Sequence, residues 1–290
     1  MIDRGIILAG GHGTRLSPLT KVTNKQLLPL YDKPLIYYSL SVLMLAGIKK
    51  ILIIVNPTEA ISYKKLLGDG SRLGINISYE EQKKPEGLPQ AFLIGEDFIK
   101  KKGVALILGD NFFYGQGLAL KLKEALKKNK GSTIFLYPVE NPSQYGVVEL
   151  NHENKIKRIT EKPKKTTSNL AITGLYFFDN KVVNFSKKLK PSKRNELEIT
   201  DLILKYKKNK SLKVAHIGRG ASWLDAGTTK DLFDASQFVS TIEKRQGLKI
   251  ACIEEIALRN KWIKKEAIIK SIKFYGNCDY SKYLKNLISK

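Results

Sequence analysis

The segment that decides the fold is Leu8-Ala9-Gly10-Gly11-His12-Gly13-Thr14-Arg15-Leu16. It begins at the end of a short apolar run, Gly5 to Ala9, which is typical of a buried strand. A glycine-rich loop, Gly10 to Ser17, follows at once. Glycines without Cβ atoms let backbone N–H groups approach phosphate oxygens closely. A strand that runs directly into such a loop predicts an α/β fold with an anion site at the end of the strand.

Helical and strand patterns alternate downstream of this loop. Helices are predicted at Pro34 to Ala46, Glu59 to Leu67 and Pro89 to Lys100, and strands at Ile51 to Val55, Ile75 to Tyr79 and Val104 to Leu108. Continuous apolar strands separated by amphipathic helices favour a parallel sheet covered on both faces. The predicted fold is therefore Rossmann-like, with a mostly parallel sheet flanked by helices. Ligands in such sheets bind beyond the carboxyl ends of the strands, where the glycine loop and Asp110 both fall.

The pattern changes after Tyr145. Alternating segments at Gly146 to Leu150, Ile156 to Glu161 and Ile172 to Phe178 predict inserted antiparallel strands. Helices follow at Glu198 to Lys207 and Lys230 to Arg245, and Glu254 to Lys290 is typical of a helical tail. We therefore expect one α/β domain over 1–250, with a first part at about 1–110 and a second part at about 140–228, and a C-terminal helical extension over 251–290.

Composition narrows the class of protein. The formal net charge is +24, but only eight of the 51 basic residues are Arg, and the Lys are scattered along the chain in pairs. This favours solvated helix faces over a nucleic-acid surface. No export signal is visible, and no apolar run approaches the roughly 20 residues of a membrane span. Cys252 and Cys278 lack the spacing of a metal site. We expect a cytoplasmic enzyme that binds neither nucleic acid nor membrane.

Two familiar phosphate-binding motifs do not fit the glycine loop. A dinucleotide fingerprint requires glycine where Leu16 stands, and a P-loop requires Gly-Lys-Ser/Thr, which does not occur in the sequence. Instead, Arg15 supplies a planar guanidinium, and Lys25, in Asn24-Lys25-Gln26-Leu27-Leu28-Pro29, supplies a second cation. Two cations beside a glycine loop are suited to a polyphosphate.

These motifs, together with Leu108-Gly109-Asp110-Asn111, Gln144-Tyr145-Gly146-Val147-Val148, Glu161-Lys162-Pro163 and Trp223-Leu224-Asp225-Ala226-Gly227-Thr228, closely resemble those of the bacterial glucose-1-phosphate thymidylyltransferases. The likeness extends over nearly the whole chain. It implies that the part at about 1–110 binds the nucleotide and that the part at about 140–228, with the inserted antiparallel strands, carries the sugar, the second substrate. It implies an enzyme that joins dTTP and glucose-1-phosphate into dTDP-glucose and pyrophosphate, for deoxysugars of the dTDP-rhamnose type and for surface polysaccharides. A sugar phosphate that is already ionised needs no general base, so positioning and charge neutralisation should dominate catalysis.

The resemblance also implies roles for individual residues. Asp110 and Asp225 would hold Mg²⁺, a hard cation that prefers carboxylate and phosphate oxygens. Arg15, Lys25 and Lys162, with these two carboxylates, would be the catalytic groups. The nucleotide site would comprise Leu8, Gly10, Gly11, Gly13, Thr14, Arg15, Gln26, Gln82, Gly87, Leu88 and Asp110, with Gln82 and the Gly87-Leu88 turn at the base. The sugar-phosphate site would comprise Tyr145, Gly146, Glu161, Lys162, Ile172, Gly174, Tyr176, Arg194 and Trp223.

The sequence departs from the family pattern at His12, Pro89, Asn195 and Ile203. None of these changes removes a charged catalytic group, but UTP or another sugar-1-phosphate stays open as an alternative substrate. A noncatalytic nucleotide-sugar sensor on the same fold is a further alternative. The resemblance implies a homotetramer, and feedback by a dTDP-sugar at a second site, for which Arg219 and the Arg245 to Gly247 region are candidates.

Overall fold

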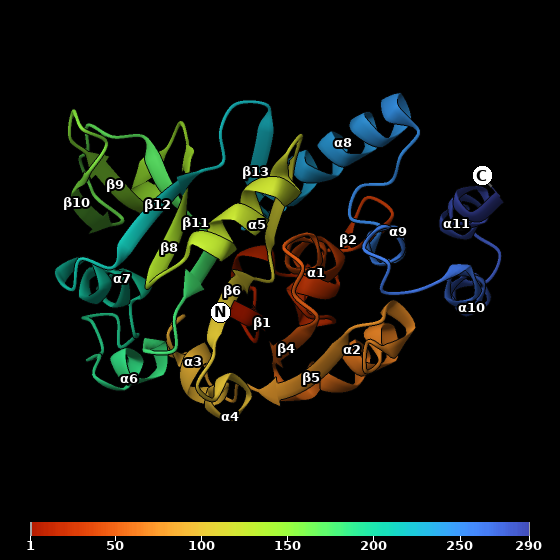
Figure 1. The fold of residues 1–290 in the computed structure, drawn as a ribbon, viewed down its shortest axis with the longest axis horizontal. Helices are drawn as coiled ribbons and strands as arrows, with labels where there is room; N and C mark the ends of the chain where they lie inside the picture. The colour runs from red at the N-terminus through yellow and green to blue at the C-terminus, as the bar shows by residue number, and fades with distance from the viewer. Residues whose placement is uncertain (1, 290) are drawn as a thin grey trace.

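The computed structural model describes residues 2–289, which form a large mixed sheet flanked by helices (Figure 1). Within this range, seven of the nine strands of the sheet lie in the order β10 (Ile156–Glu161), β9 (Gly146–Leu150), β11 (Leu170–Phe178), β6 (Gly103–Leu108), β1 (Ile2–Ala9), β4 (Lys50–Val55) and β5 (Asn76–Glu81). The other two are β8 (Ser132–Pro138), which pairs with β11, and β12 (Leu212–His216), which pairs with β8.

The first half of the chain builds the parallel part of the sheet. β1 pairs in parallel with both β4 and β6, and β4 pairs in parallel with β5. Residues 51–55 and 104–107 are buried throughout, because helices cover both faces of these strands. The predicted Rossmann-like arrangement is confirmed, as are the antiparallel additions, because β11 runs antiparallel to β6 and β9 antiparallel to β10.

Four predicted helices occur with small shifts, as α1 (Ile36–Leu45), α2 (Ala60–Leu67), α7 (Ile199–Lys208) and α8 (Thr229–Gln246). Two further helices, α5 (Leu118–Lys128) and α6 (Val182–Lys187), were not predicted. The single helix expected at Pro89 to Lys100 is wrong, because it is divided at Gly95 into α3 (Gln90–Ile94) and α4 (Glu96–Ile99). Gly95 packs closely against β1, since a Cβ there would lie 3.0 Å from Ile6 Cδ1.

The C-terminal tail folds into three helices, α9 (Ile253–Arg259), α10 (Lys265–Tyr275) and α11 (Asp279–Ser289). They lie at the opposite end of the molecule from β9 and β10 (Figure 1). Glu254 is fully buried between the tail and the α/β core, where it accepts hydrogen bonds from Arg72 at 3.2 Å and from Tyr275 and Tyr280 at 2.6 and 2.7 Å. The last residue of the predicted tail, Lys290, lies outside the described residues.

Two strands that the periodicity did not predict form a separate antiparallel pair, β7 (Asn111–Gly115) and β13 (Ala221–Asp225). Their register places Asp225 opposite Asn111, and the backbone N–H of Ala226 donates to the carbonyl of Asp110 at 3.1 Å. This pairing brings residue 225 next to residue 110 across more than a hundred residues of chain.

None of the helices within residues 2–289 is both long and apolar enough to cross a bilayer.

Candidate active site

The carboxyl ends of the parallel strands meet at one edge of the sheet. The register aligns Ala9 with Val55, Val55 with Glu81, and Leu8 with Leu108. Consequently the glycine turn after β1, Gln82 after β5 and Asp110 after β6 all start from the same edge. This edge is where doubly wound sheets bind ligands.

A cavity of about 570 Å³ opens at this edge and extends toward the antiparallel strands. Of the residues predicted for the nucleotide, Leu8, Gly11, Arg15, Gln26, Gln82, Gly87, Leu88 and Asp110 line it. Gly10, Gly13 and Thr14 are not among its lining residues. Gly13 instead shapes the turn, since its φ of 61° is in the left-handed region that favours glycine. The turn therefore presents Gly11 and Arg15 to the cavity.

Lys25 and Asp110 form a close ion pair, with Nζ to Oδ2 at 2.6 Å. Lys25 is only 5% exposed, and its short 3₁₀ turn is capped by Asn24, whose Oδ1 accepts from the backbone N–H of Gln26 at 3.1 Å. Burial by itself would raise the pKa of Asp110, but the Lys25 ammonium more than offsets it, so the pKa lies below the usual range. Asp110 is therefore held ionised.

Asp225 has the opposite electrostatic environment. Burial and the neighbouring charge of Asp110 raise the pKa of Asp225 to about 7, despite the lowering influence of Lys25 and Arg15. Its Oδ1 is buried and accepts no hydrogen bond from the described residues. An ionised carboxylate with a bare oxygen beside a second carboxylate is stabilised by a bound cation.

The donor set fits a divalent metal that completes its shell with substrate and water. Within residues 2–289 there is no cluster of three or more His, Cys, Asp or Glu that would form an all-protein cage. Two carboxylates are what Mg²⁺ commonly takes from a protein when phosphate oxygens and water supply the rest. Arg15 lies close by, because a Cβ on Gly227 would be 3.2 Å from its Nη2 and 3.4 Å from Asp225 Oδ2.

A smaller cavity of about 160 Å³ adjoins the first. Eight of the nine residues predicted for the sugar phosphate line it, namely Tyr145, Gly146, Glu161, Lys162, Ile172, Gly174, Tyr176 and Trp223. The ninth, Arg194, lines only the larger cavity. Asp225 and Lys162 line both, so they lie where the two cavities meet. This junction is where two bound substrates would come into contact.

The wall of the smaller cavity depends on Asn111, a residue of the Leu108-Gly109-Asp110-Asn111 motif for which no role was predicted from the sequence. Its Oδ1 accepts from the indole Nε1 of Trp223 at 2.6 Å and from the backbone N–H of Gly174 at 3.0 Å, while its Nδ2 donates to Asp110 Oδ1 at 3.0 Å. Asn111 is 1% exposed. Asn111 therefore connects Asp110, a carboxylate that would bind the metal, with the wall of the smaller cavity.

Charged groups at the rim are partly paired. Arg194 makes a two-point contact with Glu198, with Nη2 to Oε2 at 2.7 Å and Nε to Oε1 at 3.1 Å, and it lies 3.7 Å from Glu161. The Thr200 hydroxyl donates to Glu161 Oε2. Lys162 is exposed, has a backbone φ of 42°, and forms no salt bridge to any described residue. Its ammonium is thus available to an anionic ligand.

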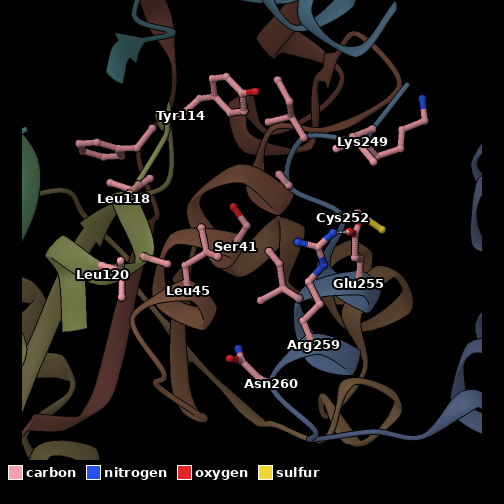
Figure 2. A pocket seen from close by; sticks show the side chains of 18 of the residues that line it. Ser41, Leu45, Tyr114, Leu118, Leu120, Lys249, Cys252, Glu255, Arg259 and Asn260 are labelled. Atoms are coloured by element: carbon pink, nitrogen blue, oxygen red, sulfur yellow. Dashed lines mark ion pairs between the residues drawn. The ribbon is translucent and has the colours of Figure 1, made fainter. Parts of the chain in front are cut away.

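A second large cavity, of about 560 Å³, lies away from this edge between α1, the β7–α5 connection and the segment that joins α8 to α9 (Figure 2). Its lining combines apolar side chains such as Leu45 and Leu118 with Lys249 and Arg259. Arg259 is held by an ion pair to Glu255 at 2.6 Å. Of the region suggested by the sequence, Gln246 lines this cavity, whereas Arg219 and Arg245 do not.

Taken with the fold, a glycine turn, two cations and two carboxylates at the sheet edge define a nucleotidyltransferase. Residues 4–242 match the family model described as Nucleotidyl transferase. The glucose-1-phosphate thymidylyltransferase of Neisseria meningitidis serogroup A is 52% identical over 287 residues, covering 99% of this chain and 100% of that protein. The one of Mycolicibacterium smegmatis is 50% identical, with 99% of each chain covered. The protein therefore belongs to the nucleotidyl transferase family and, within it, to the glucose-1-phosphate thymidylyltransferases.

Solved structures agree with this assignment. A glucose-1-phosphate thymidylyltransferase from Bacillus anthracis in complex with a sucrose superposes with a TM-score of 0.75 at 39% identity, covering 81% of this chain and 94% of that one. A UDP-glucose pyrophosphorylase complexed with UDP-glucose gives 0.73 at 28% identity, covering 84% and 100%. The predicted family and fold class are confirmed.

Proposed function

We propose that the protein transfers a thymidylyl group from dTTP to glucose-1-phosphate, giving dTDP-glucose and pyrophosphate. The observation that carries the proposal is the placement of Asp225 and Lys162 at the junction of two adjoining cavities, with Arg15 and Asp110 lining the larger one. Lys25 does not line that cavity but is paired with Asp110 at its wall. The larger cavity takes the nucleotide and the smaller one the hexose. The printed names of the relatives support the substrates.

In this mechanism a phosphate oxygen of glucose-1-phosphate attacks the α-phosphorus of dTTP. The new O–P bond forms as the bond from the α-phosphorus to the bridging oxygen breaks, and pyrophosphate leaves in line. Arg15 and Lys25 neutralise the triphosphate, while Lys162 and Arg194 hold the sugar phosphate, so two polyanions can approach despite their repulsion. No side chain needs to remove a proton, because the attacking oxygen is already ionised.

A divalent metal completes the site. Nucleotidyltransferases of this family are generally dependent on a divalent metal. We propose Mg²⁺, held by Asp110 and Asp225, which would supply charge neutralisation for the phosphates. The bare Oδ1 of Asp225 and the charge of Asp110 beside it support this assignment. They also weigh against the noncatalytic sensor, which would have no need for two carboxylates in repulsive proximity.

The remaining parts of the proposal concern the molecule as a whole. We propose that 1–250 act as the catalytic domain and 251–290 as an extension, that the enzyme is a cytoplasmic homotetramer, and that a dTDP-sugar inhibits it. The second cavity, with Lys249 and Arg259 at its wall, suits a ligand that carries both phosphate and apolar surface (Figure 2). It is the effector site that we propose.

The test is a matrix of nucleoside triphosphates against sugar-1-phosphates, scored by pyrophosphate release with Mg²⁺ and again after chelation. We expect dTTP with glucose-1-phosphate to give the highest kcat/KM and chelation to abolish turnover. Preference for UTP would move the enzyme toward the activity named for the second solved structure. Binding of dTDP-glucose without turnover of any pair would favour the sensor.

A further inference from the structure

Gln82 lies in the wall of the larger cavity, and the nitrogen of its amide already has a hydrogen-bond partner. It follows β5 at the sheet edge, is 2% exposed, and lines the cavity beside Gly11 and Gly87. Its Nε2 donates to Oε1 of Gln90, the first residue of α3, at 2.6 Å. The orientation of the Gln82 amide therefore depends on that of Gln90.

The amide of Gln90 can adopt only one orientation. Its Oε1 also accepts from the backbone N–H of Glu86 at 3.0 Å, and its Nε2 donates to Glu86 Oε2 at 2.9 Å. A backbone N–H can only donate, and an ionised carboxylate can only accept. Rotating the Gln90 amide by 180° would set donor against donor and acceptor against acceptor, so Gln90 presents oxygen to Gln82.

The segment that carries Glu86 is itself anchored. The carbonyl of Glu86 accepts from the backbone N–H of Leu197 at 2.8 Å, and Gly87 forms a parallel bridge with Leu197. Gly87 has a φ of 104°, and a Cβ there would collide with the Leu197 backbone. The turn is thus held against the segment before α7. This fixes the backbone of Glu86, the residue that forms both hydrogen bonds to the Gln90 amide.

The consequence falls on Gln82 Oε1. With Nε2 turned toward Gln90, Oε1 lies over Gly10, where any Cβ would collide with it. No described residue donates a hydrogen bond to this oxygen, yet it is not among the fully buried unpartnered oxygens, so it keeps access to the cavity that Gln82 lines. Gln82 therefore presents its oxygen, and not its NH₂ group, to the cavity, because Gln90 and Glu86 fix the orientation of the Gln82 amide.

We propose that Gln90 is a positioning residue for base selection. It holds Gln82 Oε1 toward the cavity, so that the site accepts a pyrimidine with an N–H donor at ring position 3, as in thymine and uracil. In cytosine the nitrogen at position 3 carries no proton. It would face Gln82 Oε1 with two acceptors in contact and no hydrogen bond between them. This inference rests on the proposed function, since it takes the larger cavity as the nucleotide site.

The experiment compares wild type, Gln90→Leu and the double variant that combines Gln90→Glu with Glu86→Gln. For each we would measure kcat/KM for dTTP with saturating glucose-1-phosphate, and the inhibition constant of dCTP against that reaction. In Gln90→Leu the Gln82 amide loses its acceptor partner and can turn its NH₂ to the cavity. We expect kcat/KM for dTTP to fall about tenfold while dCTP binds as well as or better than before.

Gln90→Glu combined with Glu86→Gln supplies the rescue. The carboxylate at position 90 still accepts from Gln82 Nε2 and from the backbone N–H of residue 86, and Glu86→Gln removes the carboxylate that lies 2.9 Å from Gln90 Nε2. The ratio between the two nucleotides should therefore return toward wild type. Equal losses for dTTP and dCTP in Gln90→Leu, or a ratio unchanged in both Gln90→Leu and the double variant, would overturn the inference. If Gln90→Leu unfolds, a dCTP-to-dTTP ratio in the double variant that differs from wild type by tenfold or more would do the same. Wild type without dTTP turnover would instead refute the proposed function.

Discussion

At the scale of single residues, two neighbouring aspartates in the same site have opposite effects on the stability of the fold. Asp110 is paired with buried Lys25, so its charge stabilises the fold. Asp225 has a bare buried oxygen and a pKa raised by burial and by Asp110, so its charge destabilises the metal-free fold. Active sites often retain such destabilising groups because the reaction requires them.

We predict that Asp110→Asn and Asp225→Asn have the same effect on activity and opposite effects on stability. Each should lower kcat by at least about a hundredfold, because each removes charge that would hold the metal. Asp225→Asn should melt at the same temperature as the metal-free wild type or a few degrees higher. Asp110→Asn should lose about 3 kcal/mol of unfolding free energy, because Lys25 is left buried without its partner.

Pyrophosphate release with Mg²⁺ and thermal melts without metal separate these outcomes. Asp97→Asn serves as control, because Asp97 is exposed on α4 and does not line the cavity. Loss of stability in both aspartate variants would show that Asp225 is not strained by its neighbour. Full activity in Asp225→Asn would remove it from the metal site.

At the scale of elements, the sequence predicts what local periodicity encodes. The apolar runs at 51–55 and 104–108 specify buried strands, and the amphipathic patterns specify helices to within a few residues. The pair β7 and β13 is not encoded in this way, because its partners are about 110 residues apart and each is only five residues long. The close packing of Gly95 against Ile6, a residue in another element, is likewise not encoded locally.

The same division applies to the site. Gly-Asp-Asn after a strand and Trp-Leu-Asp-Ala-Gly-Thr allow both aspartates to be proposed from their motifs, but only the β7–β13 register shows that they are neighbours. Asn111 has no signature that separates a wall-building amide from a surface one, and its hydrogen bonds to Trp223 and Gly174 require the folded chain.

Helix α8 begins directly after the segment that carries Asp225, so its cap should matter for both stability and activity. The Thr228 hydroxyl accepts from the backbone N–H of Asp231 at 3.2 Å, while the Asp231 carboxylate accepts from the Thr228 N–H at 2.9 Å, which completes a capping box. We predict that Thr228→Ala lowers the unfolding free energy by about 1 kcal/mol and weakens Mg²⁺ activation.

Denaturant titration and the Mg²⁺ concentration for half-maximal rate would measure the two effects of this substitution. The matched control is Thr229→Ala, since Thr229 is exposed and lies inside the helix without a capping bond. Equal stability of the two variants would show that the capping box is not important for α8.

At the scale of the whole molecule, two cavities of similar size share structural elements. β7 follows Asp110 directly, and its last residues, Phe113 to Gly115, line the second cavity. The wall beyond them is completed by α9 and the segment before it, which buried Glu254 ties to α10 and α11. A ligand in the second cavity thus contacts the strand that starts at the proposed metal-binding edge and the tail at the far end of the molecule (Figures 1 and 2).

We predict that dTDP-sugars inhibit the enzyme through this second cavity and that Arg259 binds their phosphates. Arg259→Gln should raise the concentration for half-inhibition by about tenfold or more, because a charge-assisted hydrogen bond to phosphate is lost.

Arg245→Gln is the matched control, since Arg245 belongs to the region suggested by the sequence but does not line the cavity. Initial rates at fixed dTTP and glucose-1-phosphate with increasing dTDP-sugar measure the effect, each variant being compared with its own uninhibited rate. A shift in Arg245→Gln alone would place the effector at the sequence-derived position. Inhibition that is strictly competitive with dTTP and unchanged in both variants would mean that the inhibitor binds only at the sheet edge.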